Sequence, residues 1–94
     1  MKIRSESQLK MLDEAIMRCG GSVVLIDSRT GKEYDLKVPA DKAEAFARLP
    51  YDYRESLELF VTRREDTEIM IGFMDKLYRE YGHVNNVTSK ENAA

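Results

Sequence analysis

Residues 22–38 read SVVLIDSRTGKEYDLKV and set the topology of this chain. Val23–Ile26 is a β-branched run too short for a helix, and both of its faces are largely apolar, as expected of a central strand. A polar loop follows, in which Gly31 is free to take a positive φ. Residues 34–38 then alternate between apolar and charged side chains. The stretch therefore predicts a β-hairpin whose second strand has one solvated face.

An amphipathic helix is predicted on the N-terminal side of the hairpin. Apolar residues recur at helical spacing over residues 9–19, and Ser5 or Ser7 can cap the start of the helix. The pair at residues 20–21 is Gly-Gly, which can supply a left-handed residue at the helix end. Met1–Arg4 alternates in polarity and predicts a short first strand ahead of this helix.

Two helices and a strand are predicted after the hairpin. Pro39 suits the first turn of a helix, which carries small apolar residues and stops at Pro50. Residues 57–62 alternate in polarity and predict a strand. The acidic residues Glu65, Asp66 and Glu68 favour the start of a long closing helix. Residues 84–94 are polar and lack periodicity, so they predict a disordered tail.

The predicted order is strand, helix, strand, strand, helix, strand, helix. This order classes the chain as α+β, with a four-stranded antiparallel sheet and three helices on one face. We expect a single domain over residues 1–83, followed by the tail at residues 84–94. Ferredoxin-like domains begin with the same series of elements, so the order alone leaves more than one fold open.

The composition limits the classes of partner. The chain has 15 basic and 17 acidic residues, and its net charge of −2 offers no field for nucleic acid or an anionic membrane. Cys19 is the only cysteine, so no internal disulfide forms and a cytoplasmic location is expected. No apolar run approaches the length of a membrane span, and Met1–Arg4 is not followed by the apolar core of a signal peptide. We expect no nucleic-acid partner and no membrane association.

The spacing of these elements resembles the HPr phosphocarrier family of the bacterial sugar phosphotransferase system. The resemblance rests on Gly31-Lys32 and Leu36-Lys37 in the hairpin, on the strand at residues 57–62 and on the acidic start of the last helix. It implies an HPr-like open-faced β-sandwich with β-α-β-β-α-β-α topology. It also implies a cytoplasmic protein concerned with carbohydrate transport or its regulation.

The phosphorylation sites of that family are missing. HPr proteins carry His-x-Arg-Pro-Ala at the start of the first helix, where this chain has SESQL at residues 5–9. Val38 stands where many Gram-positive members have a regulatory serine. Ser5 and Ser7 remain as candidate phosphate acceptors, because backbone amides at a helix N-terminus favour an anion. Helix capping is the competing role for such a serine, and Glu6 would repel a phosphate.

No pattern in the sequence indicates a catalytic site. His83 has no Cys or His neighbour with which to bind a metal, and Cys19 lies on the apolar side of its helix, as an inert thiol would. The carboxylates are interleaved with Lys and Arg and give neither an acid–base pair nor a metal-ligand spacing. We therefore expect no enzyme activity, no metal and no cofactor.

Protein binding remains as the first hypothesis. HPr proteins dock through the exposed faces of their first two helices. Tyr51 and Tyr53 in the connector suit an interface or close the edge of the core, and Met11 and Met17 form a soft contact patch or widen the buried stripe. We expect a divergent HPr-like protein, not competent in phosphotransfer, that binds a phosphotransferase-system component or regulator. The matching candidates for partner contact are Gln8, Met11, Lys42, Phe46 and Leu49.

Two alternatives stay open. One is a phosphocarrier or kinase target that uses Ser5 or Ser7. The other is a ferredoxin-like nucleic-acid-binding module, although the acidic net charge argues against it. Such a module needs its basic residues on one face beside an aromatic platform. The residues in question are Arg29, Lys32, Lys37, Arg63 and Arg64, with Tyr34 or Phe60 as the platform.

Overall fold

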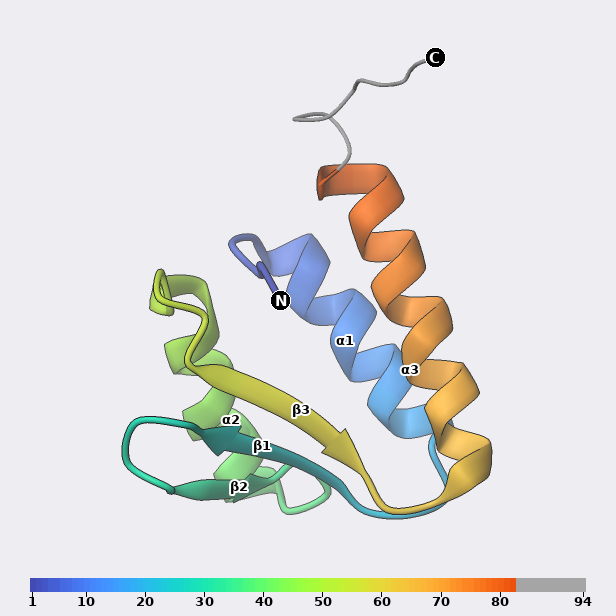
Figure 1. Cartoon of the computed structure of the whole chain (residues 1–94), viewed down its shortest axis with the longest axis horizontal. Helices are drawn as coiled ribbons and strands as arrows, with labels where there is room; N and C mark the ends of the chain where they lie inside the picture. The colour runs from blue at the N-terminus through green and yellow to red at the C-terminus, as the bar shows by residue number, and fades with distance from the viewer. Residues whose placement is uncertain (83–94) are drawn as a thin grey trace.

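The computed structural model describes residues 1–82, apart from the side chain of Tyr81. These residues form an α+β fold in the order α-β-β-α-β-α (Figure 1). His83 and the expected tail at residues 84–94 lie outside the described residues. The elements are α1 (Glu6–Arg18), β1 (Val23–Asp27), β2 (Glu33–Asp35), α2 (Pro39–Arg48), the 3₁₀ turn η1 (Leu49–Tyr51), β3 (Leu57–Val61), α3 (Arg64–Leu77) and the π-helical turn η2 (Tyr78–Gly82).

The sheet is antiparallel and has the strand order β2-β1-β3. In its centre, Val24 of β1 lies opposite Asp35 of β2 and Phe60 of β3. The predicted hairpin is confirmed, and Gly31 in its loop has a φ of 78°. The strand β2 is shorter than expected because the backbone N–H of Lys37 turns back to the side chain of Asp35.

The predicted four-stranded β-α-β-β-α-β-α topology is wrong, because Met1–Arg4 forms no strand. The backbone N–H groups of Arg4 and Ser5 both donate to the side-chain Oε1 of Gln8, so they are not available to a sheet ladder. The side chain of Ile3 is fully buried in the core, which accounts for the alternation in polarity without strand pairing. As a result, β3 is an edge strand.

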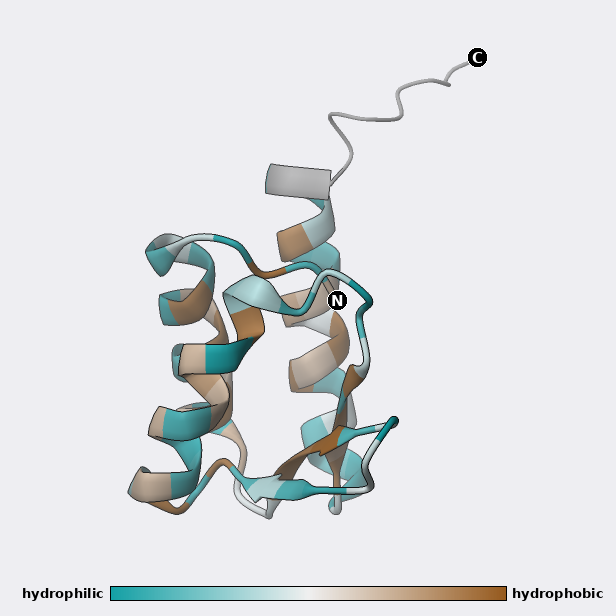
Figure 2. Ribbon diagram, turned by 90° about the vertical axis from the view of Figure 1, so that its left-hand side faces the viewer, coloured by the Kyte–Doolittle hydropathy of each residue, from teal (hydrophilic) through white to brown (hydrophobic). Residues whose placement is uncertain are grey.

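The helices bury one face of the sheet. Along β1, Val23, Leu25 and Asp27 are buried, whereas the side chains between them are only partly covered. Figure 1 shows α2 behind β1, and Figure 2 shows hydrophobic and hydrophilic residues alternating along the helices, as one-sided packing requires. The opposite face of the sheet is left open. The helices contribute Leu12, Ala15, Ile16, Ala45, Met70, Phe73 and Leu77 to the core.

The helices α1 and α3 lie side by side and are tied together by Asp66 (Figure 1). This carboxylate is 2% exposed and accepts the backbone N–H groups of Gly20 at 3.0 Å and Gly21 at 2.8 Å. The two glycines do not take the left-handed conformation predicted for a helix end. Gly21 is needed for space instead, since a Cβ there would come within 2.5 Å of Cγ of Arg63.

Candidate functional site

A pocket opens where the β1–β2 loop meets the segment that leads into β3. The last residue pair between β1 and β3 is Asp27 with Leu57. Beyond it, the backbone N–H of Ser28 donates to the carbonyl of Ser56 at 2.8 Å and keeps the two loops joined. The pocket has a volume of about 400 Å³. We call it the arginine pocket, and it is lined by Arg29, Ala47, Arg48, Tyr51, Asp52, Tyr53, Arg54 and Ser56.

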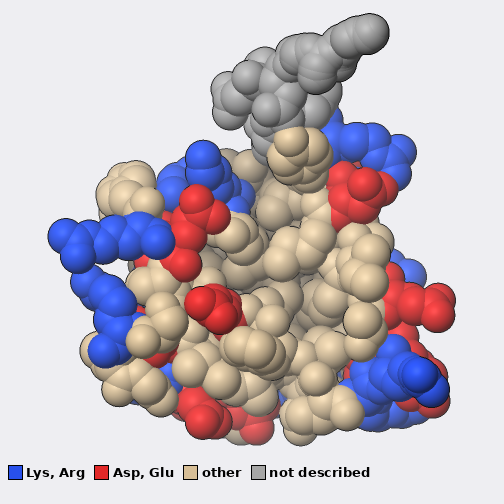
Figure 3. All heavy atoms as spheres, in the orientation of Figure 1, with Lys and Arg blue, Asp and Glu red and all other residues tan. Residues whose placement is uncertain are grey.

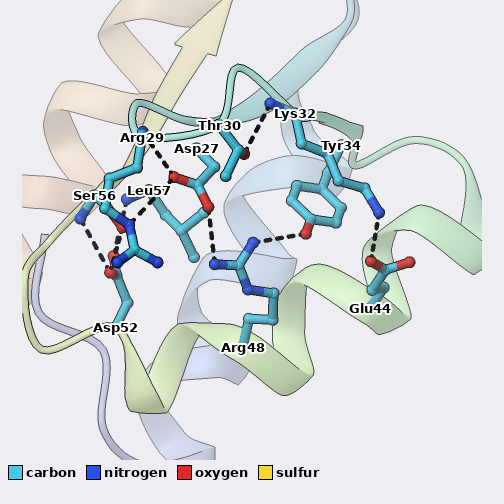
Figure 4. Close-up of polar contacts among 10 residues, drawn as sticks. All are labelled: Asp27, Arg29, Thr30, Lys32, Tyr34, Glu44, Arg48, Asp52, Ser56 and Leu57. Atoms are coloured by element: carbon cyan, nitrogen blue, oxygen red, sulfur yellow. Dashed lines mark hydrogen bonds and ion pairs between the residues drawn. The ribbon is translucent and has the colours of Figure 1, made fainter.

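Arg48, at the end of α2, is the fixed cation of the pocket. Its Nη1 donates to the hydroxyl of Tyr34 at 2.7 Å, and its Nη2 donates to Oδ2 of Asp27 at 2.9 Å (Figure 4). Tyr34 and Asp27 are each 1% exposed. The bond to Tyr34 and then the bond to Asp27 raise the pKa of Arg48. The guanidinium is therefore charged and has one orientation.

Asp27 holds a second arginine as well. Its Oδ1 accepts the backbone N–H of Arg29 at 2.9 Å and lies 3.9 Å from Nε of the same residue (Figure 4). The backbone bond from Arg29 and then the side-chain bond from Arg48 lower the pKa of Asp27. One buried carboxylate thus fixes both the β1–β2 loop and the end of α2.

Asp52 orders the segment on the other side of the pocket. It accepts hydrogen bonds from the N–H of Ser56 at 3.0 Å, the hydroxyl of Ser56 at 2.8 Å and the N–H of Leu57 at 2.9 Å (Figure 4). Burial acts to raise the pKa of Asp52, but the bonds from Leu57 and Ser56 outweigh it and the pKa is lowered. Asp52 therefore stays ionised and keeps the loop in place.

The rim of the pocket is aromatic and cationic. Tyr51 is 72% exposed and Tyr53 is 71% exposed. The guanidinium of Arg4 lies 4.9 Å from the ring centre of Tyr53, which joins the start of α1 to the pocket. Arg54 is exposed and makes no hydrogen bond or ion pair with the described residues. The Arg29 side chain is 54% exposed, so both arginines can meet an anionic group from solvent.

This arrangement suits recognition of an anionic surface. A guanidinium presents a planar fork of donors to a carboxylate or phosphate, and a tyrosine gives apolar area with a polar tip. Within the described residues, no group of three His, Cys, Asp or Glu side chains gathers as a metal ion would require. No helix in that part of the chain is long and apolar enough to cross a membrane.

The residues predicted at the start of α1 form a helix cap. Ser5 accepts the backbone N–H of Gln8 at 3.2 Å, and the Gln8 side chain accepts the N–H of Ser5 in return. Ser7 is exposed on the first turn. The expectation that Gln8 offers a surface to a partner is wrong, because capping turns its side chain inward and leaves it 7% exposed.

The other predicted contact residues lie in or against the core. Leu49 is 1% exposed, because the turn η1 points it into the core, so it too is not a surface residue. Met11 and Phe46 are partly buried against the core. Lys42 pairs with Asp13 at 2.8 Å and ties α2 to α1. None of these residues lines the arginine pocket.

The structure does not gather the basic residues named for nucleic-acid binding. Arg29 follows the Asp27 end of β1, whereas Arg63 lies beyond the opposite end of β3. Tyr34 is buried and cannot stack on a base. Phe60 is 47% exposed, but no strand residue on its face of the sheet is basic.

No protein-family model, no curated protein and no solved structure matches this chain. The proposals below therefore rest on the site itself and on the resemblance stated for the sequence.

Proposed function

We propose that this chain is a divergent HPr-like domain that does not transfer phosphate and binds an acidic surface of a protein partner through the arginine pocket. The partner belongs to sugar phosphotransferase transport or its regulation, the setting that the resemblance implies. One observation carries the proposal: a guanidinium fixed by Tyr34 and Asp27 lies beside exposed tyrosines and an arginine without a partner among the described residues.

The composition of the pocket supports a protein partner. Tyr and Arg are enriched at protein interfaces and dominate their binding energy, because both present large contact areas with directed donors. Arg48 is already held in place, so a partner carboxylate would not have to order it. The arginines Arg29 and Arg54 extend the positive charge to the rim.

The position of the pocket supports the link to the HPr resemblance. The guanidinium of Arg4 stacks on Tyr53 and places the start of α1 next to the pocket. The resemblance implies docking through the exposed faces of the first two helices, and Arg48 at the end of α2 lines the same pocket.

The state of the serines favours binding over phosphotransfer. The hydroxyl of Ser5 accepts a hydrogen bond in the helix cap. Val38, at the position of the regulatory serine, has no hydroxyl. We therefore expect the intact mass to stay unchanged after incubation with phosphoenolpyruvate and the general phosphotransferase enzyme, or with ATP and an HPr kinase, while a histidine-containing HPr gains one phosphate.

A binding titration tests the proposal. The general phosphotransferase enzyme, an HPr kinase and a sugar-specific transport component are immobilised in turn, and the chain is titrated over each. We expect one of them to bind, and we expect Arg54→Glu and Tyr53→Ala each to weaken binding by about tenfold or more. Arg64→Glu is the matched control, since Arg64 is also exposed but lies at the start of α3.

The outcomes separate the parts of the proposal. Failure of all three proteins to bind would overturn the link to sugar transport. Binding that is weakened equally by Arg54→Glu and Arg64→Glu would overturn the assignment to the arginine pocket. A gain of one phosphate in the mass experiment would overturn the non-phosphorylated role.

A further inference from the structure

The face of the sheet that the helices leave open is a second surface with its own chemistry. The strand register places two rows of three side chains on it, one row across Val24 and one across Ile26. We call this surface the open sheet face. It consists of Val24, Ile26, Glu33, Asp35, Glu58 and Phe60.

The centre of the open sheet face is apolar. Val24 and Ile26 of β1 are only partly covered, and Phe60 beside Val24 is 47% exposed. Aromatic and β-branched side chains in adjacent positions of a sheet form a continuous apolar surface. The described residues place no helix over this surface, so these side chains remain in contact with solvent.

The charge on this face has one sign. Glu33 and Glu58 flank Ile26 on its two sides, and Asp35 flanks Val24. No strand residue of the open sheet face is basic. Neither Glu33 nor Glu58 makes an ion pair with the described residues. Figure 3 shows red side chains over the sheet at the lower left and blue ones at the left and lower-right margins.

We propose that the open sheet face binds a basic amphipathic segment of a partner protein, which places apolar side chains on Val24, Ile26 and Phe60 and Lys or Arg beside the carboxylates. Unpaired carboxylates on either side of an apolar centre are complementary to that pattern. An amphipathic helix has this pattern, because its apolar side chains lie on one face and its charged side chains on the other. This surface is separate from the arginine pocket, so the inference goes beyond the proposed function.

A second copy of the chain is a poorer occupant. Two open sheet faces brought together would place carboxylates against carboxylates around a small apolar centre, and like charges oppose such an association. The open face also lacks the donors that would satisfy another set of carboxylates. The test below therefore includes the oligomeric state.

The test uses two labelled peptides of about 18 residues with the same leucine stripe, one with Lys and one with Glu on the polar face. Fluorescence anisotropy is recorded as the full chain is added, at low salt and at about 0.5 M salt. We expect the Lys peptide to bind at least about tenfold more tightly than the Glu peptide, and we expect high salt to reduce the difference.

Two variants and a control locate the site. Phe60→Ser removes apolar area, and the double variant Glu33→Lys/Glu58→Lys reverses the charge; each should weaken binding of the Lys peptide by about tenfold. Ile71→Ser is the control, because Ile71 is 62% exposed on α3. Circular dichroism establishes that each variant is folded. The double variant keeps the whole apolar centre, so it stays informative if Phe60→Ser fails to fold.

Three outcomes would overturn the inference. One is equal affinity for the two peptides. Another is a loss of binding in Ile71→Ser as large as in Phe60→Ser. The third is a dimer, detected by analytical ultracentrifugation without peptide, that the charge reversal or Phe60→Ser abolishes, since that result would assign the face to a second copy.

Discussion

Nη2 of Arg48 lies 2.9 Å from Oδ2 of Asp27, so the last residue of α2 is bonded to the last residue of the central strand β1. The carboxylate is 1% exposed, and the other oxygen accepts the backbone N–H of Arg29. A buried carboxylate that loses a charged partner remains desolvated without compensation. The pair is therefore structural as well as part of the pocket wall.

Replacing Arg48 by Met should lower the free energy of unfolding more than replacing Arg54 by Met. Arg54 has no partner among the described residues, whereas Arg48 bonds to Asp27 and Tyr34. Urea denaturation at neutral pH measures both. Asp27→Asn should lower the free energy of unfolding less in the Arg48→Met variant than in the parent chain, because the pair acts as a unit. Equal losses in the two single variants would contradict the role of Arg48.

Stability should fall as the pH is lowered into the acid range. The pKa values of Asp27, Asp52 and Asp66 are lowered in the folded chain by the hydrogen bonds that these carboxylates accept. A lowered pKa contributes stability above the unfolded value of about 3.9, and this contribution is lost as the pH falls through the folded values. Urea midpoints between about pH 7 and pH 2 measure the loss. The Asp66→Asn variant should be less stable at neutral pH, and its stability should fall less steeply with acid. An unchanged slope would contradict the stabilising role of the hydrogen bonds from Gly20 and Gly21 to Asp66.

The hydroxyl of Ser5 should be needed as a helix cap. Ser5→Ala removes the acceptor for the N–H of Gln8 and should cost about 1 kcal/mol, whereas Ser5→Asp also caps helices and should cost little. Thermal unfolding followed by circular dichroism measures both. Ser7→Ala is the control, because Ser7 lies inside the first turn of α1. A Ser5→Ala variant as stable as the parent would show that the cap contributes nothing.

Leu49 should behave as a core residue. Leu49→Ala leaves a cavity beside the sheet and should lower the free energy of unfolding by about 2–5 kcal/mol. Tyr51→Ala, two residues later and 72% exposed, should change it by less than about 0.5 kcal/mol. The same denaturation experiment compares the two. A small effect of Leu49→Ala would contradict the assignment of Leu49 to the core.

The hairpin and the helices could be predicted because their signals are local. The alternation after Gly31, the apolar stripe of α1 and the Pro39 start of α2 each depend on neighbouring residues, and each is found in the structure. The prediction of an N-terminal strand is wrong because the alternation of Met1–Arg4 in polarity also suits an unpaired segment that buries only Ile3. Whether this segment joins the sheet depends on Gln8, because the Gln8 side chain accepts the backbone N–H groups of Arg4 and Ser5.

The arginine pocket could be predicted only in part. The sequence indicates Tyr51 and Tyr53 as residues that either suit an interface or close the edge of the core, and both are exposed. The bonds from Arg48 to Asp27 and Tyr34 join residues 21 and 14 positions apart, and no local pattern indicates them. The prediction that Leu49 contacts a partner is wrong for a related reason, since the turn η1 after α2 decides which way its side chain points.

The contact between Asp66 and Gly20 spans 46 positions of the chain. Closing so long a loop is slow compared with forming the local hairpin, and it becomes favourable once Val23 and Val61 have paired next to it. The backbone N–H groups of Gly20 and Gly21, which follow α1, therefore gain this acceptor only when the first turn of α3 is in place. The position of α1 against α3 thus depends on a contact that is distant in the sequence, not on a local turn.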